Sequence, residues 1–270
     1  MSRAIIQSKD IKIAVAFLSM RGINLIYNSI DSALRKGASL EFLAGLDMQT
    51  TEPAALQFLH NLSKNNNNLS LYCYASIEPS SIYHPKIYLL KNNDDTRVIC
   101  IVGSSNLTEG GLRKNIEANF VIEADTNQDI VLDSYITYNR LKFHPKRVIP
   151  DDEFLNLYSE LCISEKKQRT EYKKNQYRKN LLKSFEEKTK ILQHPKPALK
   201  DLIGWVKLVF EYLPDKEFTT NQLYAHEKDF SYIYPENKNI KAKIRQQLQV
   251  LRDIGLIKHI GKSHWVKEQI

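Results

Sequence analysis

A histidine and a lysine stand one residue apart at the start of an apolar run in the first half of the chain. The run begins the segment HPKIYLLKNNDDTRVICIVGSSNLTEGG, residues 84–111. Side chains two residues apart on a strand point to the same side, so His84 and Lys86 are expected side by side. Pro85 lacks a backbone N–H and favours a strand start or an irregularity here. The pattern indicates a site that needs both side chains together.

More polar side chains follow along the same predicted hairpin. NNDD at 92–95 predicts a turn, and the strand returning from it brings Ser104 and Asn106 back toward the histidine. A third strand, NIEANFVIE at 115–123, carries Glu117 among residues that alternate with its apolar ones.

These residue types together supply what phosphodiester cleavage requires. A neutral imidazole can attack phosphorus. Ammonium, amide and hydroxyl donors can hold the non-bridging oxygens and stabilise the charge that develops on them, and a carboxylate can hold an imidazole in one tautomer. The alternative for the histidine is a purely structural role. The predicted catalytic residues, which need no metal and no cofactor, are His84, Lys86, Ser104, Asn106 and Glu117.

The order HxK…GSxN resembles the phospholipase D superfamily, and HPK…GSSNLTEGGLRKNIEANF resembles its branch of metal-independent, BfiI-like restriction endonucleases. The similarity covers about residues 1–160. It implies a phospholipase D-like mixed α/β sheet flanked by helices, and it implies that the residues named above form the active site. The superfamily often has an aspartate five residues after the lysine. Lys91 occupies that place here, and the nuclease branch also lacks the aspartate.

The sequence has one complete copy of the motif, whereas phospholipases carry two in one chain. The reaction needs one imidazole to attack and another to protonate the leaving oxygen. One motif per chain therefore predicts a homodimer with a composite active site at the twofold axis. A second HPK, at His144–Lys146, has no GSxN after it. We interpret His144 as the end of a basic helix near a domain boundary, and a catalytic role is the alternative.

The first part of the chain alternates between strand and helix patterns. Apolar runs predict strands at 11–19, 39–46 and 69–76, and helical spacing of apolar residues predicts helices at 23–37 and 52–64. Strands that alternate with helices predict an α/β sheet with parallel pairs.

The last part of the chain has a different pattern. A helix is predicted at 199–214, a second with a threonine cap in FTTNQLYAHEKDF, and a third with an apolar stripe at 239–255. Two short strands around a glycine turn follow in LIKHIGKSHWVK. Three helices and a hairpin predict a winged helix-turn-helix.

Polar residues around the third helix favour DNA binding over the alternative, a protein-interaction or dimerisation module. Basic side chains supply phosphate contacts, and Asn, Gln and Arg can read base edges in a major groove. The segment from about residue 200 to residue 267 resembles the winged-helix domain of DpnI-type restriction enzymes. The resemblance implies that this domain takes part in recognising the target sequence. The predicted DNA-binding residues are Lys238, Asn239, Lys241, Lys243, Arg245, Gln246 and Gln249, with Lys262 and His264 at the wing.

Composition and charge are those of a globular protein with one basic segment. Of the 270 residues, 42% are apolar and 26% charged, and the net charge is +8. Eleven Lys and Arg stand against four Glu between Glu165 and Lys196, which indicates either a solvated helical connector or a stripe beside a polyanion. The three cysteines lie far apart, and neither a membrane-length apolar run nor a signal peptide is present. These features predict a cytoplasmic protein with no membrane partner.

The predicted domains are a catalytic and dimerisation domain at 1–162, a basic helical linker at 163–197 and a DNA-recognition domain at 198–270. Together they predict a type II restriction endonuclease that cuts double-stranded DNA through a covalent phosphohistidine. One alternative is a DNA-binding regulator with an inactive nuclease fold. The other is a phosphatidyl-transferring phospholipase D-like enzyme, for which the sequence has neither a membrane element nor a second motif.

Overall fold

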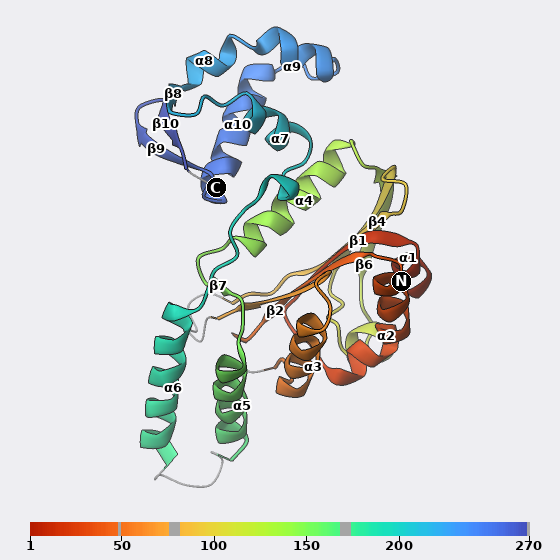
Figure 1. Cartoon of the computed structure of the whole chain (residues 1–270). Coiled ribbons are helices and arrows are strands. Elements are labelled where there is room, and N and C mark those ends of the chain that lie inside the picture. The colour runs from red at the N-terminus through yellow and green to blue at the C-terminus, as the bar shows by residue number, and fades with distance from the viewer. Residues whose placement is uncertain (48–49, 76–81, 168–173, 269–270) are drawn as a thin grey trace. The chain divides into compact units, whose positions relative to one another are not determined.

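The computed structural model describes residues 1–47, 50–75, 82–167 and 174–268 (Figure 1). The chain forms two compact units, one of residues 1–131 with 145–195 and the other of residues 132–144 with 196–270. The second unit therefore includes a segment from the middle of the chain. The domain limits that the sequence suggests, at residues 162 and 197, remain predictions.

The first unit is built on a mixed sheet, which confirms the predicted fold class. The described strands lie in the order β6-β5-β4-β1-β2-β3-β7. β1 pairs with β2, and β2 with β3, in parallel, while the remaining neighbours are antiparallel. The strands are β1 Ser8–Val15, β2 Ser39–Gly45, β3 Leu69–Tyr74, β4 Lys86–Asn92, β5 Arg97–Gly103, β6 Asn119–Asp125 and β7 Arg147–Val148.

Helices connect and flank these strands. α2 begins after Ser19, whose side chain accepts a hydrogen bond from the backbone N–H of Gly22, a typical N-cap. α3 begins at Pro53, where a helix loses nothing by the missing N–H. The described helices in this part of the chain are α1 Ser2–Ile6, α2 Met20–Arg35, α3 Pro53–Lys64, the π-helical turn η2 Gly110–Lys114, α4 Asp129–Lys142, α5 Asp152–Lys167 and α6 Lys174–Ile191.

One apolar core holds the first unit together. Alternate residues of the strands, such as Ile13 and Phe42, face the buried stripes of α2 and α3. The basic segment also contributes to this core. Leu181 and Phe185 of α6 are buried, and the Phe185 ring lies 4.7 Å from that of Phe154 on α5. Burial of each such side chain contributes about 1.5–3 kcal/mol, so α6 is packed onto the first unit.

The second unit has the predicted winged-helix architecture around a core of its own, which includes Trp205, Ile244 and Trp265. The expected helix at 199–214 is a 3₁₀ turn followed by a shorter helix, and the expected second helix is divided in two. Thr219 caps α8 as predicted, in a reciprocal capping box with Gln222. The elements are η3 Leu199–Asp201, α7 Gly204–Glu211, β8 Glu217–Thr219, α8 Thr220–Tyr224, α9 Glu227–Ile233, α10 Ile240–Asp253, β9 Ile257–Gly261 and β10 His264–Lys267.

The end of α4 is fixed inside the second unit by a buried ion pair. Lys142 Nζ lies 2.9 Å from a carboxylate oxygen of Asp201, and both side chains are only 4% exposed. The other Asp201 oxygen accepts from the backbone N–H of Ala198 at 2.9 Å. The pair ties the segment before α7 to α4, which explains why residues 132–144 belong to this unit.

Two absences hold for the segments that the structure describes. None of their helices combines the length and apolar character needed to cross a lipid bilayer. Their His, Cys, Asp and Glu side chains do not gather in groups of three or more that could hold a metal ion.

Candidate active site and nucleic-acid interface

The predicted catalytic residues lie at one end of three neighbouring strands. Lys86 is the first residue of β4 and pairs with Val15, the last residue of β1. Gly103 ends β5 and pairs with Asn119, which begins β6. This is also the carboxyl end of the parallel strands β1 and β2, the edge at which open α/β sheets bind their ligands. An added Cβ at Gly103 would lie 2.3 Å from the main-chain oxygen of Ala118, so glycine allows β6 to approach this closely.

His84 and Lys86 are in contact. The Lys86 ammonium lies 2.8 Å from Nδ1 and 3.0 Å from Nε2 of the His84 ring, and it donates to the His84 main-chain oxygen at 3.1 Å. The sequence places both residues on the strand, but β4 begins at Lys86. His84 therefore lies in the segment just before the strand and outside the regular ladder. Its ring packs edge-on against Phe17 at 5.6 Å.

The electrostatics of this pair favour a neutral imidazole. Burial and the adjacent Lys86 charge both lower the pKa of His84 from its ordinary value of 6.5. Burial also lowers the pKa of Lys86, and the carboxylate of Glu117 acts in the opposite direction. A histidine with a lowered pKa is unprotonated near neutral pH, which is the form that can act as a nucleophile.

Glu117 and Ser104 form the second contact of the site. Ser104 Oγ donates to Glu117 Oε2, and Asn115 Nδ2 donates to Glu117 Oε1 at 3.0 Å. These two hydrogen bonds lower the pKa of Glu117, and the nearby charge of Lys86 lowers it further by a smaller amount. The carboxylate is thus held as an anion beside the lysine, and within one chain its hydrogen bonds go to Ser104 and Asn115.

Asn106 is held by the end of β1. Its Oδ1 accepts a hydrogen bond from the backbone N–H of Phe17 at 3.0 Å, and Nδ2 is the group of this amide that can donate. Phe17 therefore links Asn106 to the His84 ring. Sequence reasoning missed this role because Phe17 falls inside an apolar run whose other residues are core residues.

The five predicted residues thus lie around one end of the sheet, where they form two side-chain contacts, and Phe17 connects Asn106 to the His84 ring. His84 contacts Lys86, and Ser104 contacts Glu117. The arrangement offers a neutral imidazole with an ammonium beside it, an amide donor, and a hydroxyl that bridges to a carboxylate. These are the groups that nucleophilic attack on a phosphodiester needs.

The second HPK spans the limit between the two units. His144 is exposed and falls in the second unit, whereas His84 belongs to the first. The main-chain oxygen of Lys146 accepts from the backbone N–H of Ala75, at the end of β3. The non-catalytic interpretation of His144 remains a prediction.

The predicted recognition helix of the winged-helix unit corresponds to α10. Its exposed side carries Lys241, Arg245 and Gln246, and Gln249 is half-buried. Arg245 donates to the Tyr224 hydroxyl at 2.9 Å, and the Lys241 ammonium lies 5.7 Å from the centre of the same ring. Tyr224 of α8 therefore orients two cations of α10.

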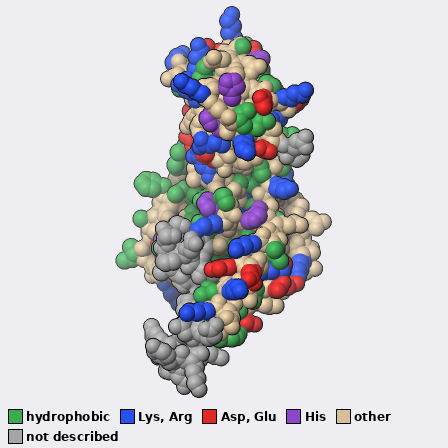
Figure 2. Space-filling view, turned by 90° about the vertical axis from the view of Figure 1, so that its left-hand side faces the viewer, with side chains coloured by type: hydrophobic (Ala, Val, Ile, Leu, Met, Phe, Trp, Pro, Cys, Tyr) green, Lys and Arg blue, Asp and Glu red, His purple; other side chains and the backbone are tan. Residues whose placement is uncertain are grey.

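The remaining predicted DNA-binding residues surround this helix. Lys241 also pairs with Glu227 at 3.4 Å, so part of its charge is already compensated. Lys243 is half-buried because a shift of two residues turns it to nearly the opposite side of the helix from Lys241. The residues exposed before the helix and on the wing are Lys238, Asn239, Lys262 and His264. Figure 2 shows Lys, Arg and His side chains projecting from this unit in the upper part of the view.

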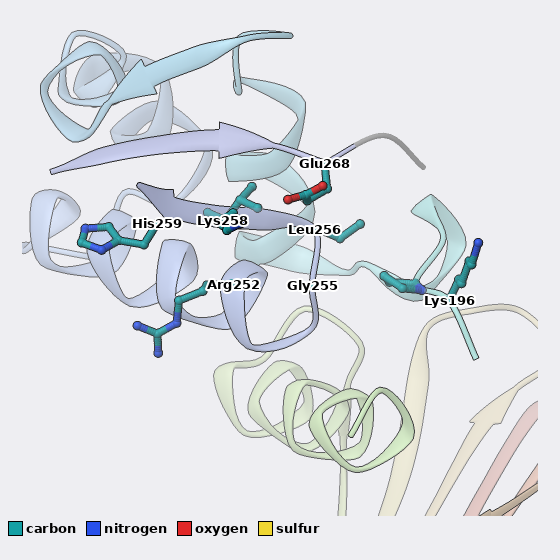
Figure 3. Close-up of a pocket in the computed structure, with 9 residues that line it drawn as sticks. Lys196, Arg252, Gly255, Leu256, Lys258, His259 and Glu268 are labelled. Carbon is teal, nitrogen blue, oxygen red and sulfur yellow. The ribbon is translucent and has the colours of Figure 1, made fainter. Parts of the chain in front are cut away.

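A pocket of about 650 Å³ lies in the second unit, where α10 ends and β9 begins (Figure 3). Arg252 and Lys258 line it together with Glu268, and Leu256 supplies an apolar wall. Arg252 is held by two hydrogen bonds to Asp253. The pocket has charges of both signs, and Arg252 lies on the same side of α10 as Arg245, about two turns further along the helix.

Both parts of the chain match known protein families. Residues 2–135 match the family described as cardiolipin synthase, PLD-like domain, and residues 200–267 match the Dam-replacing HTH domain family. Among solved structures, NucT from Helicobacter pylori is 16% identical, with a TM-score of 0.38 over 52% of this chain and 83% of that chain. Phosphatidylserine synthase from Haemophilus influenzae Rd KW20 is 15% identical, with a TM-score of 0.43 over 70% of this chain and 41% of that chain.

Proposed function

Since the chain joins a phospholipase D-like domain to a DpnI-type winged-helix domain, we propose that it is a nuclease of the phospholipase D superfamily that acts on double-stranded DNA. In its specific form the proposal is a type II restriction endonuclease. The observation that carries it is the contact of the buried Lys86 with the His84 ring, in a chain that also has a winged-helix domain.

The proposed reaction has two steps. The neutral His84 imidazole attacks phosphorus, and the bond from phosphorus to the leaving oxygen breaks. That oxygen takes a proton from an imidazolium, the His84 of a second protomer. Water then attacks the phosphohistidine, gives its proton to the now neutral second imidazole, and restores His84. Lys86 and the Asn106 amide hold the non-bridging oxygens, and no step uses a metal ion.

An exposed apolar surface beside the site supports a homodimer with a composite active site. Val102 and Phe120 are paired across β5 and β6 on one face of the sheet, and they are 45% and 80% exposed. Ile116, next to Glu117, is fully exposed. β6 lies at the edge of the described sheet. Exposed apolar residues gathered at one place mark an interaction surface, and a second copy here would bring two His84 residues together.

The winged-helix domain supplies the DNA partner in this proposal. Arg245 and Lys241 are oriented by Tyr224 for backbone or base contacts, and Gln246 is exposed on the same helix. Phosphate contacts position a protein on DNA, and contacts to base edges give sequence preference. We propose that the winged-helix domain selects the site that the catalytic domain cuts. The cytoplasm remains the predicted compartment.

Incubation of the protein with plasmid DNA in excess EDTA tests the proposal. Cleavage is expected in EDTA because the proposed reaction needs no divalent ion. The fragments should be discrete because the proposed enzyme cuts at a specific sequence. A digest that begins only when Mg²⁺ is added would refute metal independence. Binding without any cleavage would instead favour the DNA-binding regulator. Matched methylated and unmethylated plasmids would show whether methylation is required or blocks cutting.

A further inference from the structure

The position of the proposed nucleophile is set by the residues on either side of it. His84 lies outside the β4 ladder, so strand pairing does not fix it. On the carboxyl side, the main-chain oxygen of Pro85 accepts from the backbone N–H of Ala16 at 2.9 Å. On the amino side, the backbone N–H of Tyr83 donates to Oδ2 of Asp47 at 2.7 Å. His84 is thus held between one backbone contact to the residue that follows β1 and one to the segment that follows β2.

Asp47 is an unusual residue for such an anchor because it is only 5% exposed. Burial raises the pKa of its carboxyl group, while the Tyr83 hydrogen bond and the nearby Lys146 and Arg147 charges lower it. Burying a carboxylate is costly unless charges and hydrogen bonds compensate it. Accepting the backbone hydrogen bond of the residue before His84 gives this buried carboxylate a specific role.

The Tyr83 side chain is also held in place, by contacts of its ring. Its ring stacks on that of Tyr74 at 4.9 Å and an angle of 17°. The buried Arg147 guanidinium lies 4.6 Å from the Tyr83 ring centre and 5.3 Å from that of Tyr74. On the β2 side, an added Cβ at Gly45 would lie 2.8 Å from the Tyr83 ring, so the ring rests on the glycine backbone. The residue before His84 is therefore held on several sides.

We propose that Asp47 is a positioning residue that sets the place of His84 through the backbone of Tyr83. This rests on the proposed role of His84 as nucleophile. Loss of the anchor would let His84 move away from Lys86 and from the line of attack on phosphorus. A displacement of about 1 Å can reduce the rate of a reaction about 100-fold without loss of substrate binding.

Three substitutions at Asp47 separate position from charge in the full-length protein. Asp47→Ala removes the acceptor, and Asp47→Glu keeps the charge but moves the acceptor by one methylene. Asp47→Asn keeps an oxygen in place and removes the charge. The matched control is Glu41→Gln, because Glu41 is a similarly buried carboxylate (6% exposed) on β2 that pairs with Lys12 at 3.5 Å.

The first readout is steady-state cleavage of a p-nitrophenyl phosphodiester and of plasmid DNA. We expect kcat to fall about 10- to 100-fold in Asp47→Ala and Asp47→Glu with KM nearly unchanged. Asp47→Asn and Glu41→Gln should remain close to wild type. If Asp47→Asn loses as much kcat as Asp47→Ala at an unchanged melting temperature, or if Asp47→Ala is fully active, the proposal is overturned.

The second readout needs no cleavage, so it remains informative if the proposed nuclease activity itself fails. In an NMR titration the pKa of His84 should rise toward its ordinary value in Asp47→Ala and Asp47→Glu, because the ring leaves Lys86. In Asp47→Asn the pKa of His84 should remain at the wild-type value. If the Ala and Glu variants fail to fold, slow hydrogen exchange of the Tyr83 amide in the wild-type protein still supports the anchor. Rapid exchange there contradicts it.

Discussion

Replacing Phe120 by aspartate is expected to separate the two protomers. Phe120 is 80% exposed on the edge strand β6, three residues from Glu117. Burying a phenylalanine side chain contributes about 1.5–3 kcal/mol, and a twofold axis counts each residue twice. The loss of this burial should therefore weaken the dimer by about 3–6 kcal/mol, or about 10²- to 10⁴-fold in dissociation constant. The buried charge would add to that loss.

Sedimentation velocity over a range of concentrations, run beside a plasmid cleavage assay, measures this effect. The control is Ile191→Asp, because Ile191 is an apolar residue of similar exposure, 75%, at the end of α6. Phe120→Asp should be monomeric and inactive at concentrations where wild type and Ile191→Asp are dimeric and active. A Phe120→Asp protein that cuts as a monomer would refute the composite site, and one that stays dimeric would place the interface elsewhere.

Three further predictions concern the site, the reader and the fold. Lys86→Met should raise the pKa of His84, since a neighbouring positive charge is lost, and an NMR titration in which the midpoint stays or falls would contradict this account. Gln246→Ala should reduce discrimination between DNA sequences by about 1–3 kcal/mol. Lys241→Ala should instead weaken binding to every sequence and reduce the salt slope of the binding constant by at most about one unit. If the two variants change discrimination and overall affinity alike, the proposed division of roles is refuted. Tyr88→Phe should lower the free energy of unfolding in urea by about 1–3 kcal/mol, because its buried hydroxyl donates at 2.9 Å to the turn after β5, and an unchanged value would show that bond to be dispensable.

The sequence predicted the elements of the fold wherever a local period was strong. The stripe of Ile240, Ile244 and Leu248 and the threonine cap at Thr219 predicted helices that the structure contains. The three residues of β8 are too few for a period to appear, so this strand of the wing sheet was missed. The role of α6 was also missed, because Leu181 and Phe185 stand among many lysines and only tertiary packing reveals their burial.

Prediction of the site followed the same rule. The spacing of His84 and Lys86 and the turn before β5 brought the motif residues to one edge of the sheet. The residues that hold them are distant in sequence. Phe17 and Asp47 act through main-chain hydrogen bonds to Asn106 and Tyr83, which carry no local sequence signal.

Trapping of the covalent intermediate tests the central claim most directly. Labelled plasmid fragments and dimeric protein are mixed at low temperature and quenched in alkali, because a phosphorus–nitrogen bond to histidine survives base and is lost in acid. The modified peptide is then identified by mass spectrometry. The account predicts DNA phosphate attached to His84 in the wild-type protein and no adduct in His84→Ala, which should still bind DNA. An adduct on His144, or cleavage by His84→Ala at the wild-type rate, would contradict it.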